Sequence, residues 1–463
     1  MLDEKIKNYL VYLVILFGFF YSCFVGLKYI QKYDVYETIS EETFNPYFFA
    51  KEGGTPSYWH EAADIQNDIK TQKYEFKYLP PKIVYFYYKL INEDIKTFSE
   101  ISNQYVLKKD NKKFGLIILQ IFLYFLCLQF LYKKVFKKLF EKNYLLILPT
   151  FIFLSFEPTL NQWIRVPYSE AIFFCLQILL LINLINYSNQ SSIKKIIIIS
   201  IILSLMYLQR TVSIYYFIIV ISYLYLYFKK RFLVNAFLIM LIYLCTHFLI
   251  GFHNFKNDGK LYFLPLLAKE DMYGYFIPKL KKYTNDTNFE TRHDKLNNFV
   301  KSKQLKNENE IDIEDRIKIA NTNFFESLKL IQKYPLQSLK EYSISLSHYI
   351  LLKPNEIHFL YENFSKYDGK YFLSDEFKKE LPLKIIYSLI IYFMCFLGLL
   401  YFYKEKKFKL IFILVTSILY FALPVAWHKQ SSYLSPVLIY LSFFFGAGFI
   451  FLKKKMINSK YER

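Results

Sequence analysis

The sequence is poor in the residues that soluble nucleotide-binding and zinc-binding domains require. Glycine occurs only 12 times in 463 residues, and no glycine-rich phosphate-binding loop is present. The five cysteines are widely spaced within apolar runs and form no CxxC pair. We therefore expect neither a disulfide framework nor a zinc site. No metal site or cofactor is predicted, although the sequence leaves a divalent metal open.

Long apolar runs with almost no charge are abundant instead, and 54% of the residues are hydrophobic. A run of about 20 apolar residues crosses the hydrocarbon core of a bilayer as one helix. Ten candidate runs are present: 9–30, 114–132, 143–156, 167–187, 195–209, 213–228, 232–252, 383–403, 409–426 and 433–452. We therefore expect an all-α polytopic membrane protein with about ten transmembrane helices, eleven or twelve being the alternative. The first run is too long for the apolar part of a signal peptide, so we expect it to be retained.

The net charge of +20 is concentrated in alternate connections between these runs. The basic residues on that side include Lys5, Lys7, Lys133, Lys134, Lys137, Lys138, Lys194, Lys195, Lys229, Lys230, Arg231, Lys404, Lys406, Lys407, Lys409, Lys453, Lys454 and Lys455. The short connections on the other side hold only Arg165, Arg210 and Lys429. Since cytoplasmic loops are enriched in lysine and arginine, we expect the lysine-rich side and both termini to be cytoplasmic. A nucleic-acid partner is not expected, because it would require one basic soluble face.

Two polar segments on the outer side divide the chain into three parts. Residues 1–252 form an N-terminal membrane module, whose outer loop 31–113 carries amphipathic helices. Residues 253–382 form a mostly polar segment with too few β-rich runs for a nucleotide-binding sheet. Within it, a helix over 311–333 is predicted to end at a proline that starts the next helix. Residues 383–463 form a C-terminal membrane module, so the middle part is expected to be a small helical outer domain.

Capping residues and prolines predict two helices in the first outer loop. Thr55 is a good N-cap and Pro56 a good first residue for a helix over 56–71, whose apolar residues share one face. A second helix over 82–93 follows a Pro-Pro pair. Both helices are expected to lie flat on the outer membrane surface.

Polar side chains gather at the outer ends of the apolar runs and in the first outer loop, where we expect function. They are Glu52, Glu61, Asp64, Glu157, Arg165, Glu170, Arg210, His253, Asn254, His428, Lys429 and Tyr433. A polar residue in or beside a membrane span is costly and is a functional candidate by default. Cations can hold a phosphate, and a carboxylate can act as general base on a hydroxyl. The shared side therefore suits a reaction on a lipid-phosphate substrate.

Several of these residues also have a purely structural interpretation. Glu170 stands in the first turn of a helix, where unpaired N–H groups stabilise an acid. Arg210 is a single charge between two short runs, which is explained by snorkelling to the headgroups or by pairing with a phosphate or carboxylate. The histidines suit interface positions, and Glu61 with Asp64 suits the solvated face of an amphipathic helix. The hypothesis depends on their common side rather than on any one residue.

The order of these motifs resembles the GT-C superfamily of integral-membrane glycosyltransferases, which use polyprenyl-phosphate-linked sugars. The likeness is strongest to the bacterial protein-mannosyltransferase-like and lipid A aminoarabinose transferase-like enzymes, so a bacterial inner membrane is expected. The stretches that carry it are 58–65 with Leu79-Pro80-Pro81, Pro167-Tyr168-Ser169-Glu170, Leu208-Gln209-Arg210, His253-Asn254 with Gly259, 320–335, and His428 with Tyr433 and Pro436.

The resemblance implies transfer of a sugar from a polyprenyl-phosphate donor to a glycan, lipid or protein acceptor on the outer side. The implied catalytic acids are Glu61, Asp64 or Glu52. The implied phosphate-binding or donor-binding residues are Arg210, Lys429, His428 and Tyr433. The implied supporting residues are Glu170, His253 and Asn254. The chain departs from the family's pattern at two positions. Thr55, or Gly54 by a shift of one residue, stands in place of the catalytic aspartate, and Ser432 stands in place of a frequent arginine that Lys429 is expected to replace.

Two other functions fit the same composition. A polysaccharide polymerase also has many spans and a large outer loop, but it transfers a preassembled lipid-linked glycan. A transporter or lipid flippase tends to show inverted repeats and charges near the bilayer midplane. In this sequence no repeat is visible and the charges stand at span ends, which favours the glycosyltransferase interpretation.

Overall fold

The computed structural model describes most of the chain, and within the described residues every regular element is a helix. These residues are 4–33, 62, 65–66, 79–95, 111–140, 144–165, 169–187, 192–228, 232–263, 273, 276–280, 292–305, 311–350, 375–424 and 431–461. The membrane bundle consists of α1 (Glu4–Tyr33), α5 (Asn111–Leu131), α7 (Tyr144–Phe156), α9 (Ser169–Tyr187), α10 (Ile193–Gln209), α11 (Tyr216–Tyr227), α12 (Phe232–Asp258), α19 (Asp375–Lys404), α20 (Phe408–Ala422) and α21 (Ser431–Tyr461). The π-helical turn η1 (Tyr132–Phe136) and α6 (Lys137–Leu139) extend α5, and α8 (Pro158–Arg165) and the 3₁₀ turn η2 (Thr211–Ser213) join bundle helices.

Each of the ten predicted apolar runs coincides with one helix of the bundle. Six of these helices are long and apolar enough to cross a membrane: α1, α5, α9, α12, α19 and α21. The other four, α7, α10, α11 and α20, are shorter. The chain is thus an all-α membrane protein, as predicted, whereas the count of ten spans stays a prediction. Several helices run past their apolar runs: α1 begins at Glu4, α12 continues to Asp258, α19 begins at Asp375 and α21 continues to Tyr461. Many polar residues have a helix propensity as high as that of apolar residues. The apolar runs therefore predicted the apolar part of each helix but not where the helix begins or ends.

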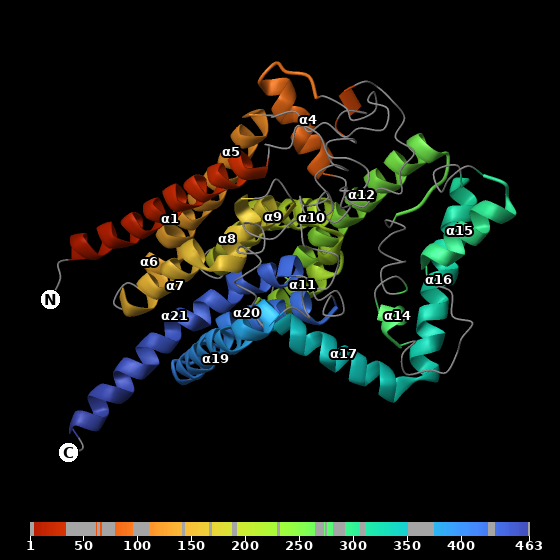
Figure 1. Cartoon of the computed structure of the whole chain (residues 1–463). Coiled ribbons are helices and arrows are strands. Elements are labelled where there is room, and N and C mark those ends of the chain that lie inside the picture. The colour runs from red at the N-terminus through yellow and green to blue at the C-terminus, as the bar shows by residue number, and fades with distance from the viewer. Residues whose placement is uncertain are drawn as a thin grey trace.

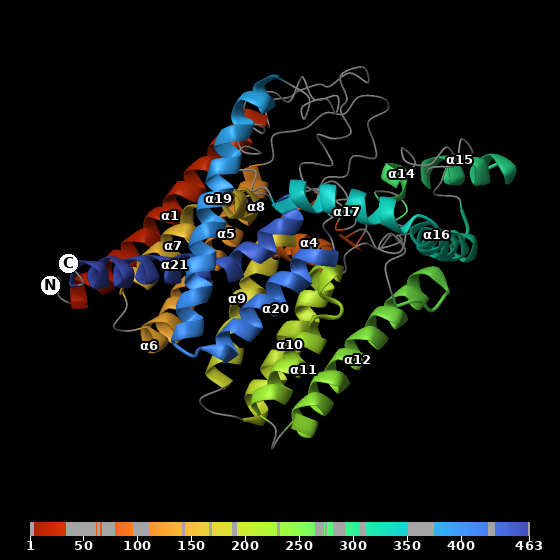
Figure 2. The ribbon, with the colours of Figure 1, turned by 90° about the horizontal axis from the view of Figure 1, so that it is seen from below.

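The two ends of the bundle differ in charge. Figures 1 and 2 show the N- and C-termini at the same end of the molecule. We call it the lysine-rich end, because it carries Lys133, Lys134, Lys194, Lys404, Lys406, Lys407, Lys409, Lys453, Lys454 and Lys455. An exposed ion pair links two helices at this end, with 2.7 Å between Lys454 Nζ of α21 and Glu405 Oε1, just after α19. We call the opposite end the outer end, after the predicted topology.

Four of the described helices lie beyond the outer end, on the side away from the chain termini (Figure 2). They are α14 (Ile277–Leu280), α15 (Arg292–Ser302), α16 (Ile313–Lys333) and α17 (Pro335–Ile350). The predicted helices over 311–333 and after Pro335 are confirmed, because Asp312 caps α16 and α17 starts at the proline. The hydroxyl of Tyr342 on α17 donates to the Leu423 carbonyl at 2.6 Å, which attaches these helices to the end of α20.

The first outer loop is described in part. Its second predicted helix is α4 (Pro80–Leu90), which begins and ends slightly earlier than the predicted range 82–93. Of the first, predicted over 56–71, residues Ala62, Ile65 and Gln66 are described and are helical. Ala62 is fully buried against α4 and α5, and the Gln66 side chain accepts a hydrogen bond from the Ile95 backbone N–H at 2.9 Å. The described part of the first outer loop is thus packed against the bundle through α4.

The C-terminal helices α19 and α21 pack backbone to backbone. A Cβ atom added to Gly398 on α19 would lie 1.8 Å from the Phe444 carbonyl oxygen of α21, and one added to Gly448 on α21 would lie 2.3 Å from the Met394 carbonyl oxygen of α19. Small residues at a helix contact let two membrane helices approach closely. Close approach matters because lipid provides no hydrophobic driving force for helix association, so van der Waals contact must contribute instead. The two glycines therefore fix the spacing of this helix pair.

We expect Gly398→Ala and Gly448→Ala each to lower the free energy of unfolding by about 1–3 kcal/mol, because the backbone facing each new methyl group cannot move aside. Gly26→Ala on α1 is the matched control, since its added Cβ would meet its nearest side-chain atom at 3.6 Å. The control should be neutral or stabilising by up to about 1 kcal/mol. Denaturation of the purified protein in detergent measures all three, and equal effects would contradict the close contact.

Candidate functional site

The outer end of the bundle holds charged side chains that are buried rather than solvated. They come from α8, from the first turn of α9 and from the break that follows α10. Arg210 is the residue at this break, with extended dihedral angles of φ −147° and ψ 122°. Its backbone N–H still bonds to the Met206 carbonyl, so α10 ends at the point where the Arg210 side chain turns into the protein.

A buried ion pair at this end joins Arg210 and Glu170. The Arg210 Nη1 atom lies 3.0 Å from Glu170 Oε1, and the two side chains are 5% and 0% exposed. This contact is electrostatic, because Glu170 Oε1 accepts no hydrogen bond with good geometry from the described residues. The guanidinium also lies 5.7 Å from the centre of the Phe173 ring, one turn further along α9. The pair thus joins the N-terminus of α9 to the C-terminus of α10.

Neutral hydrogen bonds reinforce this junction. The Gln209 side-chain amide donates to the Ser169 carbonyl at 2.9 Å, and the Ser169 hydroxyl donates to Glu170 Oε2 at 3.2 Å. The Ser213 hydroxyl donates to the Arg210 carbonyl at 2.8 Å. A buried charge is tolerated when it has a partner of opposite charge and when its other polar atoms form hydrogen bonds. The three hydrogen bonds described here supply some of those that the pair and its neighbours need.

A second buried polar set, which we call the α8 set, lies on the short helix before α9. Glu157 caps this helix, since its Oε2 atom accepts from the Leu160 backbone N–H at 2.7 Å. One turn later the Asn161 Oδ1 atom accepts from Arg165 Nη2 at 3.0 Å and from the Ser22 hydroxyl of α1 at 2.6 Å. Across the bundle, the Tyr387 hydroxyl of α19 donates to Glu157 Oε1 at 3.3 Å. The α8 set therefore gathers groups from three helices.

Burial makes Glu157 a carboxyl that can exchange a proton near neutral pH. The residue lies at the junction of α7 and α8 and is 3% exposed. Desolvation raises the pKa of its carboxyl to about 7, against the opposite effect of the N–H groups of Leu160 and Thr159 and of the Tyr387 hydroxyl. Groups with such values suit general acid–base work.

The end of α12 is held by backbone and aromatic contacts. Gly259, at φ +72°, turns the chain back after α12, and the Asn254 side-chain amide donates to the Tyr262 carbonyl at 2.7 Å. The Tyr207 hydroxyl of α10 donates to the Phe263 carbonyl at 3.0 Å. His253 is half-buried beside Asn254. Asn254 therefore has a defined structural role, in folding the chain as it leaves α12.

The structure describes only part of the predicted site. Glu52, Glu61, Asp64, His428 and Lys429 lie outside the described residues, and Tyr433 is described only as part of helix α21. Glu170 and Arg210 are brought into direct contact. Of the two interpretations of Arg210, pairing with a carboxylate is the one observed, because the side chain turns inward and does not reach the surface.

The first outer loop reaches this buried ion pair through the backbone. The Leu79 N–H, just before α4, donates to the Leu208 carbonyl at 3.1 Å, two residues before Arg210. Ala62, which lies between Glu61 and Asp64 in the sequence, is buried on the same α4. The start of α4 is therefore bonded to the chain two residues before Arg210, and Ala62 packs further along the same helix.

The sequence predicts only part of the α8 set. It indicates Glu157 and Arg165 as charges on the outer side, but it does not indicate Asn161, Ser22 or Tyr387. Two local signals pointed to α8: Glu157 precedes a proline that can start a helix, and Asn161 and Arg165 are four residues apart and so share one helix face. Nothing local indicated Ser22 or Tyr387, which are distant in the sequence.

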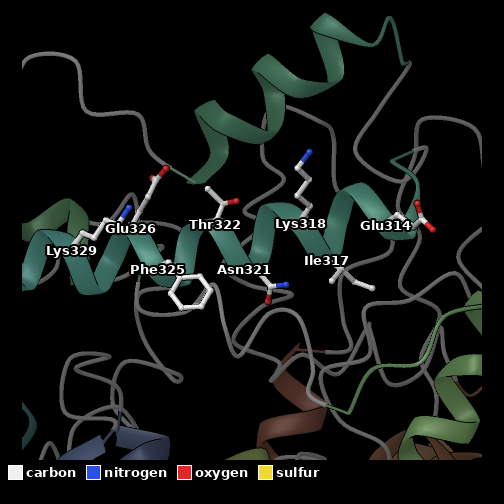
Figure 3. A pocket seen from close by; sticks show the side chains of 8 residues that line it. All are labelled: Glu314, Ile317, Lys318, Asn321, Thr322, Phe325, Glu326 and Lys329. Atoms are coloured by element: carbon white, nitrogen blue, oxygen red, sulfur yellow. The ribbon is translucent and has the colours of Figure 1, made fainter.

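A large open hollow lies elsewhere, on α16 of the outer helices, and has a volume of about 450 Å³. Figure 3 shows its lining side chains spread along one helix, with Lys318 and Thr322 on one side and Phe325 on the other. Phe325 is 61% exposed. Since these described groups point apart rather than toward one another, the hollow offers no converging chemistry.

We expect Glu170→Gln or Arg210→Gln to lower the free energy of unfolding by about 3–5 kcal/mol, because either change leaves the other charge buried without its partner. The double variant should lose less than the sum of the two single variants. Glu405→Gln, in the exposed pair with Lys454, is the matched control and should cost at most about 1 kcal/mol. Thermal or chemical unfolding in detergent measures the four variants, and strict additivity of the two single changes would contradict the coupling.

Comparison with known proteins identifies no relative of this chain. No family model, no curated protein and no solved structure matches the chain. Its class therefore rests on its own long apolar helices, and that class is an integral membrane protein built from α-helices.

Proposed function

We propose that the chain is a membrane glycosyltransferase of the GT-C type, which moves a sugar from a polyprenyl-phosphate donor to an acceptor at the outer end of the bundle. The observation that supports it best is that buried acids and guanidinium groups gather at that end, in the Glu170–Arg210 pair and the α8 set. A reaction on a lipid phosphate needs cations and a carboxylate on the same side of the membrane, at the depth of the headgroups.

The ion pair has a positioning role in this proposal. Arg210 and Glu170 fix the ends of α9 and α10, and α10 in turn holds the start of α4 through Leu208. The acids of the first outer loop, Glu61 and Asp64, with Glu52 as the third candidate, would then stand over a rigid support. The donor phosphate would be bound by His428, Lys429 and Tyr433, between the predicted ninth and tenth spans.

Glu157 is a further candidate for proton transfer. Its carboxyl, with a pKa raised to about 7 by burial, could take a proton from an acceptor hydroxyl and release it again near neutral pH. It is bound on one side by the N-terminus of α8 and on the other by Tyr387, so its orientation is fixed.

The two alternatives predict different consequences. A polysaccharide polymerase would change the length of a preassembled glycan, whereas a single-sugar transferase changes the mass of a glycolipid or glycoprotein by one residue. A transporter or flippase would change neither structure directly, but only the side of the membrane on which a lipid accumulates. The charges of the Glu170–Arg210 pair and the α8 set stand at helix ends rather than in the middle of long helices, which favours the transferase.

Mass analysis of surface glycolipids and glycoproteins, with and without the gene, should show the loss of one hexose or pentose unit from one class of molecule. Glu61→Gln or Asp64→Asn should reduce the transfer by about 10²–10⁴-fold if that residue is the general base. Membrane insertion should remain intact in both variants.

The matched control for this experiment is Glu93→Gln, an exposed acid in the same outer loop. It should leave the glycan masses unchanged. Loss of a whole polymer ladder would indicate the polymerase instead. Unchanged glycans after removal of the gene would reject a transferase function altogether.

A further inference from the structure

We propose that the lysine-rich end contains a binding site for an anionic phospholipid, in a cavity of about 220 Å³ between α9, α11 and α20. This site lies at the opposite end of the bundle from the buried charged sets. It does not depend on the proposed transferase function. Three observations carry it: the chemistry of the lining, the shape of the turn that supplies the lysines, and the partner of the nearby acid.

The lining of the cavity is amphiphilic. Its inner wall is apolar and buried, formed by Phe140, Ile185, Tyr223, Leu410 and Ile413. Its mouth carries three exposed lysines, Lys406, Lys407 and Lys409. An apolar interior behind a cationic rim matches a molecule with a hydrocarbon chain and a negatively charged headgroup. A free phosphate would leave the apolar wall unused.

The turn between α19 and α20 places the three lysines together at the mouth. Lys406 has a positive φ of 54°, a backbone conformation that costs free energy for any residue with a side chain. The N–H groups of Lys406 and Lys407 bond back to the carbonyls of Tyr403 and Phe402, which closes the end of α19. Both lysines therefore project from a fixed turn rather than from a loose connection.

The acid in this turn does not neutralise the cavity. Glu405 pairs with Lys454 on α21, with 2.7 Å between Oε1 and Nζ. The Nζ atom of Lys409 lies 5.3 Å from the ring centres of both Tyr227 and Phe228 on the α11 side, so aromatic faces hold this lysine near the mouth. Within the described lining, the rim thus carries positive charge and no carboxylate.

Basic pockets between transmembrane helices are suited to anionic lipid headgroups, and a Lys near an anionic membrane surface contributes about 1 kcal/mol to binding. That value corresponds to roughly a fivefold change in affinity for each lysine neutralised. We therefore expect the acyl chain to enter the apolar cavity while Lys406, Lys407 and Lys409 contact the phosphate. Binding should weaken as salt is raised, since exposed charges are screened.

The test uses the full-length protein purified in a neutral detergent, with dioleoyl phosphatidylglycerol as the probe and dioleoyl phosphatidylcholine as the zwitterionic comparison. Phosphatidylglycerol should raise the melting temperature, and lipid retention in native mass spectrometry should show one tightly held molecule. Replacing the three rim lysines (Lys406→Gln, Lys407→Gln, Lys409→Gln) should weaken this binding by roughly 100-fold.

The matched control removes the same charge from exposed lysines at the same end that do not line the cavity, by Lys134→Gln, Lys453→Gln and Lys455→Gln. It should keep the binding within about fivefold of the original. A second variant, Ile185→Phe, narrows the cavity without changing charge and should also weaken retention, provided that its melting temperature without lipid is unchanged.

Three results would overturn the proposal. Equal losses in the two triple variants would mean that the lipid responds only to overall charge. Equal stabilisation by phosphatidylcholine would remove the role of the lysines. Equal stabilisation by glycerol 1-phosphate would show that the headgroup alone is bound and the cavity is not used.

Discussion

A charged residue buried where a membrane helix ends requires a partner of opposite charge, and the ion pair between Glu170 and Arg210 meets that requirement in this protein. It fixes the start of α9 relative to the end of α10, two helices that are mostly apolar along their length. The first outer loop depends on the same junction, because α4 is attached to Leu208 beside the pair.

The two ends of the molecule use the same residue types in opposite ways. At the lysine-rich end, cations are exposed and acids are few, so charge is available to the surrounding medium. At the outer end, two arginines are buried against acids, amides and rings: Arg165 lies 5.0 Å from the ring of Tyr21, and Arg210 packs on Phe173. Positive charge therefore faces outward at one end and serves internal packing at the other.

The sequence predicted what local patterns determine. The ten apolar runs fall on ten helices, and the helices before and after Pro335 are where capping and proline chemistry required. The sequence predicts Glu170 in the first turn of a helix, and a carboxylate is one of the partners that it predicts for Arg210. These features depend on neighbours a few residues apart, and such neighbours are visible in a single sequence.

The remaining features depend on pairings between distant parts of the chain. Asn161 meets Ser22 across 139 residues, and Glu157 meets Tyr387 across 230 residues. Helix crossing angles and rotations decide these partners, and no periodicity encodes them. The close approach at Gly398 and Gly448 belongs to the same class, because a glycine in an apolar run predicts a helix contact without saying which helix lies against it.

The position of α21 has a consequence for biogenesis. It is the most enclosed of the six long apolar helices: 83% of its apolar span is buried, whereas the value is 28% for α1 and for α12. It packs on α7, α9 and α19, all of which precede it along the chain. Because a chain is synthesised from its N-terminus, α7, α9 and α19 are made before the helix that they enclose. The contacts that complete the interior of the bundle therefore cannot form until α21 has been made.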